Sequence, residues 1–175
     1  MSFTSSNKPR PLGVMSQGRR RRARLAAVQA LYQMEIAGAT AATIVAEFRR
    51  HRLGGEVEGV PMDEVDVDFF AELVTGAGGR RAEIDEAIAS VLTPDWRIER
   101  LEAVLRAILR AGVHELMACR DLPPKVTISE YVAVADAFFS GREPAMVNGV
   151  LDRLARHFRP GETEADADGG HAAPR

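Results

Sequence analysis

The stretch from Arg97 to Ala118 constrains the fold more than any other part of this sequence. Its apolar residues recur at spacings of three and four, which is the period of an α-helix. They are Leu101, Val104, Leu105, Ile108, Leu109, Gly112 and Leu116. An apolar stripe of this width is typical of a helix that packs in a core. We therefore predict that residues 97–118 form the central helix of the protein.

Six further segments show helical periodicity, and no segment alternates convincingly like a β-strand. The first three are predicted to start at Arg19, Ala41 and about Asp63. They are expected to end at the C-capping Gly38, at Arg52, and at the glycines 76, 78 and 79. The stretch from Gly54 to Pro61 is predicted to be a loop.

The other three segments lie on either side of the central helix. One holds Ile84, Ile88, Val91 and Leu92, and the Thr93-Pro94 pair after it suits an N-cap and a first helical position. The next is expected to open with a capping box made by Thr127 and Glu130. The last begins at Pro144 and continues to Phe158. The sequence therefore predicts an all-α fold of about seven helices.

The length of 175 residues fits one domain, or two small subdomains that share a core. Residues 1–18 mix Ser, Pro, Gly and Asn without periodicity and are predicted to be a flexible leader. Residues 19–158 hold the predicted helices. Residues 159–175 form an acidic tail that we expect to be disordered.

Charge is distributed unevenly along the chain. The formal net charge is −2, but the first 34 residues carry seven basic residues and no acidic residue. Residues 35–158 hold 21 acidic and 14 basic residues. A basic N-terminal segment followed by an acidic remainder indicates that the chain contacts a polyanion through its N-terminal segment alone.

Cysteine usage and hydropathy favour a cytoplasmic protein without membrane contact. Cys119 is the only cysteine, which excludes an intrachain disulfide and fits a reducing compartment. No apolar run is long enough to span a bilayer, and no secretory signal is present. The Arg-rich start also has the composition of an organellar transit peptide, but it runs directly into a helix that the core needs.

The run Arg19–Arg22, followed by Arg24, is the sharpest candidate site. A guanidinium binds phosphate oxygens through paired N–H groups and also stacks on bases. Cations at a helix N-terminus oppose the helix dipole, so stability alone does not favour this arrangement. The run therefore indicates nucleic-acid binding. A solvated basic end or a targeting signal is the alternative.

Motifs of an enzyme, a cofactor site or a metal site are missing from the sequence. Residues 76–79 (Gly-Ala-Gly-Gly) follow a helix and lack the Lys-Ser/Thr of a phosphate-binding loop, so we interpret them as a helix end and linker. The four histidines have no metal-ligand spacing, and His114 is expected to be packed and hydrogen-bonded. Cys119 is interpreted as a buried apolar residue, and the acidic stretch 63–68 as a solvated helix start.

Asn148 and Gly149 are unusual inside a predicted helix. Glycine there costs roughly 1 kcal/mol relative to alanine, and asparagine is also a poor helix former. Their pairing predicts close packing, a binding surface, or both.

Four motifs, in order, resemble the NusB family of transcription antitermination factors. The first is Arg-Arg-Arg-Ala-Arg (20–24) followed by Val-Gln-Ala-Leu-Tyr (28–32). The others are Ile-Leu-Arg with Glu-Leu (108–110 and 115–116), Pro-Pro-Lys-Val (123–126) and Val-Asn-Gly-Val-Leu-Asp (147–152). The resemblance covers roughly residues 19–158, nearly the whole predicted folded region.

The resemblance implies two three-helix subdomains packed across each other, at about residues 19–79 and 80–158, with one additional helix. It implies a protein that is not an enzyme and needs no cofactor. Such a protein binds single-stranded boxA-type RNA together with NusE, a ribosomal small-subunit protein. The assembly is expected to join the RNA polymerase elongation complex with other Nus factors and to support ribosomal RNA transcription.

The arginine run and the resemblance together nominate one set of RNA-binding residues. They are Arg19, Arg20, Arg21, Arg22, Arg24, Tyr32, Arg142, Met146 and Asn148. Ala145-Met146 departs from the Lys-Phe that is frequent in the family, so stacking on a base is replaced by a softer contact. Leu105 stands where the family has an acid, which puts one charged contact in doubt. Arg142 also replaces an acid and adds a cation to the expected RNA face.

Two other functions stay open as alternatives. NusB-like domains also occur fused to RNA methyltransferases, but this chain is expected to leave no room for a Rossmann-like catalytic domain and has no Gly-rich cofactor loop. The other alternative is a helical protein–protein scaffold with an incidental basic arm. Salt-dependent RNA binding would separate that scaffold from an RNA-binding adaptor.

Overall fold

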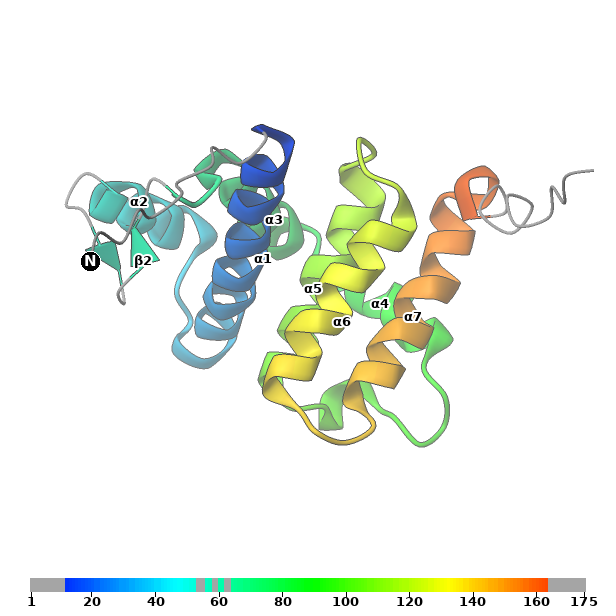
Figure 1. The fold of residues 1–175 in the computed structure, drawn as a ribbon. Helices are drawn as coiled ribbons and strands as arrows, with labels where there is room; N and C mark the ends of the chain where they lie inside the picture. The colour runs from blue at the N-terminus through cyan, green and yellow to red at the C-terminus, as the bar shows by residue number, and fades with distance from the viewer. Residues whose placement is uncertain (1–11, 53–55, 58–59, 62–63, 164–175) are drawn as a thin grey trace, which may run out of the picture.

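The computed structural model describes residues 12–52, 56–57, 60–61 and 64–163, and it is almost entirely helical (Figure 1). The elements are α1 (Leu12–Ala37), α2 (Ala41–Arg52), β1 (Glu56–Val57), β2 (Val60–Pro61), α3 (Val67–Gly79), α4 (Arg81–Val91), η2 (Ile98–Arg100), α5 (Ala103–Ala118), α6 (Pro124–Phe138) and α7 (Glu143–Phe158). The all-α class with about seven helices is therefore confirmed. No helix among the described residues has the length and apolar character needed to cross a membrane.

The helix α5 is central, as its apolar stripe predicted. It packs against α1, α3, α4, α6 and α7, and Leu109 is fully buried in it. Burial on so many sides also takes three polar residues, Arg110, His114 and Glu115, out of water. Each therefore needs a hydrogen-bonding partner from a neighbouring helix.

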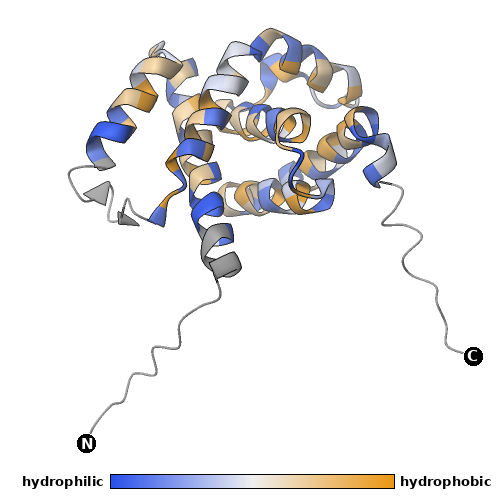
Figure 2. Cartoon of the chain, turned by 90° about the horizontal axis from the view of Figure 1, so that it is seen from above, coloured by the Kyte–Doolittle hydropathy of each residue, from blue (hydrophilic) through white to orange (hydrophobic). Residues whose placement is uncertain are grey.

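The buried apolar residues form two clusters. The smaller lies among α1, α2 and α3, and the larger among α4, α5, α6 and α7. Residues of α1 belong to both, because Ala23 and Ala27 face the smaller cluster while Val28 and Leu31 face the larger. Figure 2 shows hydrophobic and hydrophilic positions interleaved along every helix. The division into subdomains at residues 19–79 and 80–158 stays a prediction.

Local capping fixes several helix ends. Gly38 has φ 69°, and its N–H donates to the Met34 carbonyl at 3.1 Å, which ends α1 where the sequence predicted. At the start of α3, the Asp66 carboxylate accepts the Phe69 N–H at 3.0 Å. Because Asp66 is this N-cap, α3 begins at Val67 rather than near Asp63.

Two features of the N-terminal half differ from the prediction. The helix α1 begins at Leu12 instead of Arg19, since extending a nucleated helix costs little even without periodicity. In the predicted loop, β1 and β2 pair antiparallel, with Glu56 opposite Pro61 and Val57 opposite Val60. Strands of two residues are too short to show alternation. Residues 1–11 of the predicted leader lie outside the described residues.

The glycines predicted to break the chain at 76 and 78 lie inside α3. A Cβ atom at Gly76 would lie 2.0 Å from His114 Nε2, so glycine is needed there for α3 to approach α5. His114 is buried, and its Nε2 lies 3.1 Å from Glu72 Oε1. The expected packed, hydrogen-bonded histidine is thus confirmed.

Two predicted helix starts in the C-terminal half were wrong. The central helix begins at Ala103, after η2, because Thr93-Pro94 forms a turn in which the Trp96 N–H donates to the Thr93 carbonyl at 2.9 Å. The helix α6 begins at Pro124, so Thr127 lies inside it and is fully buried rather than capping it.

The predicted disordered tail begins within ordered structure. The buried Arg159 donates through Nη2 to the carbonyls of Leu122 at 2.7 Å and Arg120 at 3.5 Å, and it pairs with Glu162. These bonds satisfy carbonyls of the turn between α5 and α6. Residues 160–163 are helical, and residues 164–175 lie outside the described residues.

Candidate nucleic-acid interface

The arginine run lies on α1 and projects to different sides of that helix. Arg20 Nη1 donates to Asp121 Oδ2 at 2.7 Å, in the turn between α5 and α6. Arg19 Nη2 reaches the Val65 carbonyl at 3.5 Å. The guanidinium of Arg20 also lies over the Phe69 ring, 4.9 Å from its centre. These contacts connect the arginine run to α3 on one side and to the turn between α5 and α6 on the other.

The next two arginines form surface ion pairs. Arg21 donates to both carboxylate oxygens of Glu130 on α6, at 3.0 and 2.9 Å. Arg22 Nη2 lies 3.0 Å from Glu64 Oε2. Exposed pairs of this kind contribute roughly 0–1 kcal/mol each, so a phosphate can replace the carboxylate at little cost.

Arg24 differs from its neighbours because it points into the core. Only 3% of its side chain is exposed, and it donates to Glu115 of α5 through Nε at 3.0 Å and Nη2 at 2.6 Å. Thr127 and Tyr131 of α6 also donate to the Glu115 carboxylate, at 3.2 and 2.8 Å. Arg24 therefore joins α1, α5 and α6, and in this structure it is not on the surface with the rest of the run.

Tyr131 makes the stability of this buried cluster dependent on pH. Burial, and then the negative charge of Glu115, raise the pKa of Tyr131 well above its ordinary value of about 10. A raised pKa in the folded state contributes stability below pH ~10 that is lost as pH rises further, because the unfolded chain ionises first.

We predict that Tyr131→Phe lowers the free energy of unfolding by about 1.5–3 kcal/mol at neutral pH, the contribution of a hydrogen bond to a charged group. Above pH ~10, stability should fall less steeply in the variant than in the wild type. Urea unfolding at a series of pH values measures both. Cys119, whose pKa is raised to about 11 mainly by burial, titrates in both proteins and cancels. Equal slopes above pH ~10 would contradict the prediction.

A second, partly buried ion-pair network holds the other end of α1. Glu35 accepts hydrogen bonds from Arg106 and, at 2.6 Å, from Arg110 of α5. Arg110 also donates to both oxygens of Asp85 on α4, at 2.7 and 2.9 Å. The hydrogen bonds from Arg106 lower the pKa of Glu35. Because α1 is fixed to α5 at two points, the surface arginines project from a rigid base.

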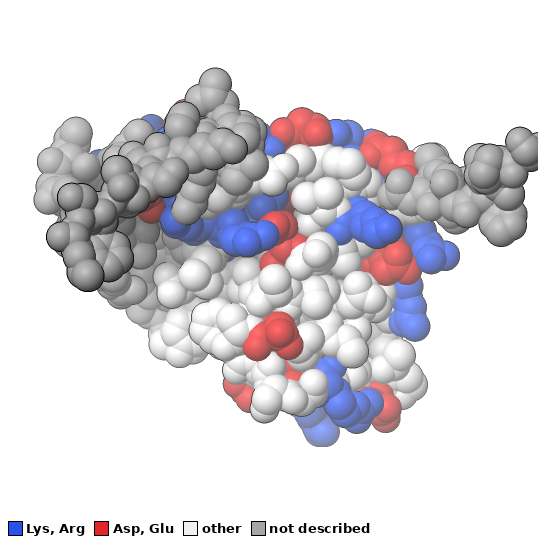
Figure 3. Space-filling view, in the orientation of Figure 1, with Lys and Arg blue, Asp and Glu red and all other residues white. Residues whose placement is uncertain are grey.

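Tyr32 lies on the same face of α1 as Arg21, in an apolar groove. The groove is about 530 Å³ and is lined by Gln29, Tyr32, Ile36, Glu102, Ala103, Val104 and Phe138. Tyr32 is 41% exposed and Ile36 62% exposed. Arg21, Leu25, Tyr32 and Ile36 follow helical spacing, so one face of α1 changes from cationic to apolar along its length. Figure 3 shows basic atoms beside acidic ones, around a broad area with neither.

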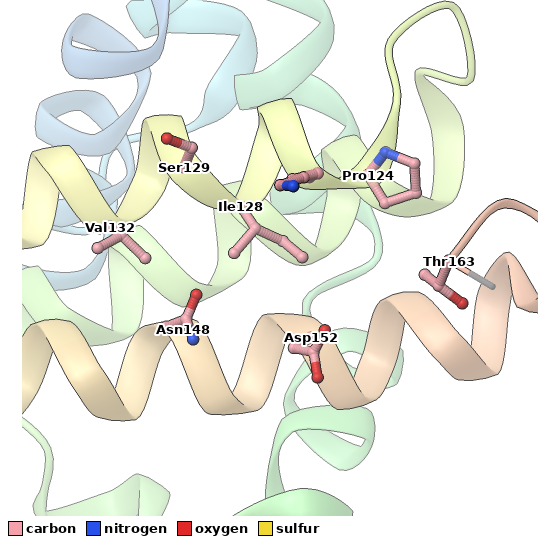
Figure 4. Close-up of a pocket in the computed structure, with 8 residues that line it drawn as sticks. Pro124, Ile128, Ser129, Val132, Asn148, Asp152 and Thr163 are labelled. Atoms are coloured by element: carbon pink, nitrogen blue, oxygen red, sulfur yellow. The ribbon is translucent and has the colours of Figure 1, made fainter. Parts of the chain in front are cut away.

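The predicted residues of α7 lie away from the arginine run. In Figure 1 the start of α7 is at the opposite end of the molecule from the start of α1. Asn148 is exposed and lines a groove of about 420 Å³ between α6 and α7 (Figure 4). Arg142 lies over Trp96 instead, 5.6 Å from the ring centre. Met146 is only 9% exposed and packs in the larger core cluster, and Leu105 is buried in the same cluster.

Several residues of the site were missed from the sequence. Glu115, Thr127 and Tyr131 position Arg24, and Trp96 contacts Arg142. A signal for Arg24 was present, because it is spaced four and seven residues from the buried Val28 and Leu31 and so shares their face. Among the described residues, no three His, Cys, Asp or Glu side chains gather to hold a metal ion.

Known proteins are similar to this chain in sequence and fold. Residues 21–156 match the model of the NusB family. The chain is 51% identical over 143 residues to the transcription antitermination protein NusB of Maricaulis maris, covering 82% of this chain and 89% of that protein.

Solved structures agree with the sequence match. The fold is similar to that of T. maritima NusB, with a TM-score of 0.68 and 29% identity over 83% of this chain and 96% of that one. It is also similar to a chain in the crystal structure of the antitermination factors NusB and NusE in complex with dsRNA. That match has a TM-score of 0.64 and 25% identity, covering 79% of this chain and 97% of the other.

Proposed function

This chain belongs to the NusB family, and we propose that it is a non-catalytic RNA-binding adaptor in transcription antitermination. The observation that carries the proposal is the surface run Arg19–Arg22 on a firmly held helix. Its relative from Maricaulis maris is named a transcription antitermination protein, and a similar chain occurs in a complex of NusB, NusE and dsRNA.

The RNA is proposed to bind through its phosphates to Arg20, Arg21 and Arg22. Their carboxylate partners Asp121, Glu130 and Glu64 occupy the guanidinium groups in the free protein. A phosphate can accept hydrogen bonds from the same guanidinium N–H groups, and RNA binding also releases counterions. We propose that the RNA is single-stranded and boxA-type, as the family resemblance implies.

The protein partner is proposed to be NusE, bound at the apolar groove beside Tyr32. Leu25, Tyr32, Ile36 and Phe138 are the large apolar side chains exposed on α1 and α6 near this groove. Exposed apolar side chains gathered in one place are typical of a protein interface. Because this face continues into Arg21, RNA and partner would lie next to each other on α1. We propose that the assembly acts with elongating RNA polymerase and other Nus factors in ribosomal RNA transcription.

An RNA titration with and without NusE tests the proposal. A fluorescein-labelled boxA-like RNA is titrated with the full chain, and fluorescence anisotropy measures binding. A scrambled RNA of equal length and composition is the control. We expect tighter binding to the boxA-like RNA and a further increase in affinity when NusE is present, because two contacts share one complex. Equal affinity for the two RNAs, unaffected by NusE, would overturn the proposed function.

A further inference from the structure

The turn between α5 and α6, residues 119–123, is held by the chain at the end of α7. Arg159 donates through Nη2 to the Leu122 carbonyl at 2.7 Å and to the Arg120 carbonyl at 3.5 Å. In the opposite direction, Nη2 of Arg120 donates to the Phe158 carbonyl at 3.4 Å. Because these bonds run both ways, the turn and the end of α7 are fixed to each other.

Arg159 is an unfavourable residue for its position if stability is its only role. Its side chain is fully buried, and its Nε and Nη1 atoms have no acceptor among the described residues. Buried donors without acceptors are costly. The carboxylate partner of Arg159, Glu162, is 44% exposed, which weakens the ion pair through solvent screening. The arginine is therefore better explained by the turn that it holds than by a gain in stability.

The two carbonyls that Arg159 holds belong to the residues immediately before and after Asp121. Fixing the backbone on both sides of Asp121 also limits the rotamers open to its short side chain. The Asp121 carboxylate lies at Arg20, whose Nη1 donates to Oδ2 at 2.7 Å, and this hydrogen bond lowers the pKa of Asp121. Figure 1 shows the end of α7, this turn and the start of α1 at the same end of the molecule.

We propose that Arg159 is a positioning residue of the RNA site, which restrains RNA binding by keeping Asp121 in place as a competitor for Arg20. The inference rests on the proposed function, in which a phosphate replaces Asp121 on this guanidinium. Arg20 also lies over the Phe69 ring and 3.9 Å from Asp66, so it stays in position when Asp121 moves away. The end of α7 is thereby coupled to a phosphate site on α1.

The first test needs no RNA. In Arg159→Met, an apolar side chain replaces the guanidinium and cannot hold the two carbonyls, so Asp121 should move away from Arg20. The Asp121 pKa should then rise toward the ordinary value of about 3.9, and NMR titration of its carboxyl carbon measures this. Arg159→Lys keeps one donor for the Leu122 carbonyl and should leave the pKa near the wild-type value.

Folding of the variants is checked by circular dichroism over the same pH range. If Arg159→Met does not fold, Arg159→Gln takes its place, because the glutamine amide is too short to hold both carbonyls. An unchanged Asp121 pKa in the folded variant would overturn the inference.

RNA affinity gives a second test, in which the expected sign is opposite to that of simple electrostatics. Arg159→Met removes a positive charge, which by itself weakens RNA binding. We expect tighter binding to the boxA-like RNA instead, by up to about 5-fold, the contribution of one surface ion pair. Arg156→Met is the charge-matched control, since Arg156 lies one turn earlier and pairs with Asp152 of its own helix. The control should bind RNA no more tightly than the wild type.

A double-mutant cycle shows whether Arg159 acts through Asp121. In the Asp121→Asn background the competing charge is absent, so Arg159→Met should no longer tighten RNA binding. Arg159→Lys should bind RNA with nearly wild-type affinity. An equal gain for Arg159→Met in both backgrounds, or weaker RNA binding by this variant in the wild-type background, would overturn the inference.

The outcomes separate this inference from the proposed function. A raised Asp121 pKa with unaltered RNA affinity would mean that Arg159 positions Asp121 without restraining RNA, which overturns the inference and leaves the proposed function standing. Failure of the wild type and of every variant to bind RNA would overturn the proposed function and the inference with it, whatever the Asp121 titration gives.

Discussion

Arg24→Ala is expected to lower the free energy of unfolding by about 3–5 kcal/mol, the cost of breaking a buried ion pair. The variant leaves the Glu115 carboxylate buried without its cation. Glu115 is fully buried, and its remaining partners, Thr127 and Tyr131, are neutral hydroxyls. Urea unfolding followed by circular dichroism measures the loss.

A matched control lies three residues away on the same helix. Arg21 also binds a carboxylate through two nitrogens, but its side chain is 71% exposed. Arg21→Ala should therefore cost at most about 1 kcal/mol. Adding Glu115→Gln to Arg24→Ala should recover part of the loss, because the unpaired charge is removed. A similar cost for Arg24→Ala and Arg21→Ala would contradict the buried-pair account.

The same variant separates two roles for Arg24. If it only positions α1, folded Arg24→Ala protein should keep the wild-type salt dependence of RNA binding. If Arg24 moves outward to contact a phosphate, the slope should fall by about 0.7. Its buried geometry leads us to expect an unchanged slope. The role that the family resemblance implied for Arg24 would then be supporting rather than direct.

Helical periodicity predicted much of the core because apolar residues dominate it, although the periodic residues Leu25, Tyr32 and Ile36 are exposed. Leu109 and Val150 are buried where their spacing predicted, since burying apolar area is the main favourable term in folding. The same rule would also have placed Met146 inside, because it is four residues from Val150. The family position suggested an RNA contact for Met146, whereas most of its side chain is in the core.

The polar contacts could not be predicted, because they depend on which helices meet. Thr127 and Glu130 have the spacing of a capping box, yet Thr127 donates to Glu115 and Glu130 accepts from Arg21. Local sequence fixes only the distance between residues along one helix. The choice of partner follows from the packing of α6 against α1 and α5, which a single sequence does not contain.

Replacing Arg20, Arg21 and Arg22 together with alanine should reduce the salt dependence of RNA binding by about 2 units of slope. Each phosphate contact on single-stranded RNA contributes roughly 0.7 to the slope of log affinity against log salt. If binding at 1 M salt is unaffected, this corresponds to roughly 100-fold weaker binding at 0.1 M salt. Anisotropy titrations between these salt concentrations measure the slope.

Loss of net charge alone must be separated from loss of contacts. The charge-matched control replaces Arg80, Arg81 and Arg156, which form ion pairs within their own helices or at a helix start. It removes the same three charges, but we expect a slope within 0.7 of the wild type, less than one phosphate contact. Equal slopes for the two triple variants would mean that the arginine run acts only through overall charge.

The acidic partners of the run supply the converse test. Glu64→Gln, Asp121→Asn and Glu130→Gln together free the guanidiniums of Arg22, Arg20 and Arg21. The number of bound phosphates should not change, so the slope should stay at the wild-type value while affinity rises. The gain should be modest, because each exposed pair that no longer has to be broken contributes at most about 1 kcal/mol. If affinity falls instead, these carboxylates orient the arginines for RNA rather than compete with it, and the phosphates must bind between the ion pairs without displacing them.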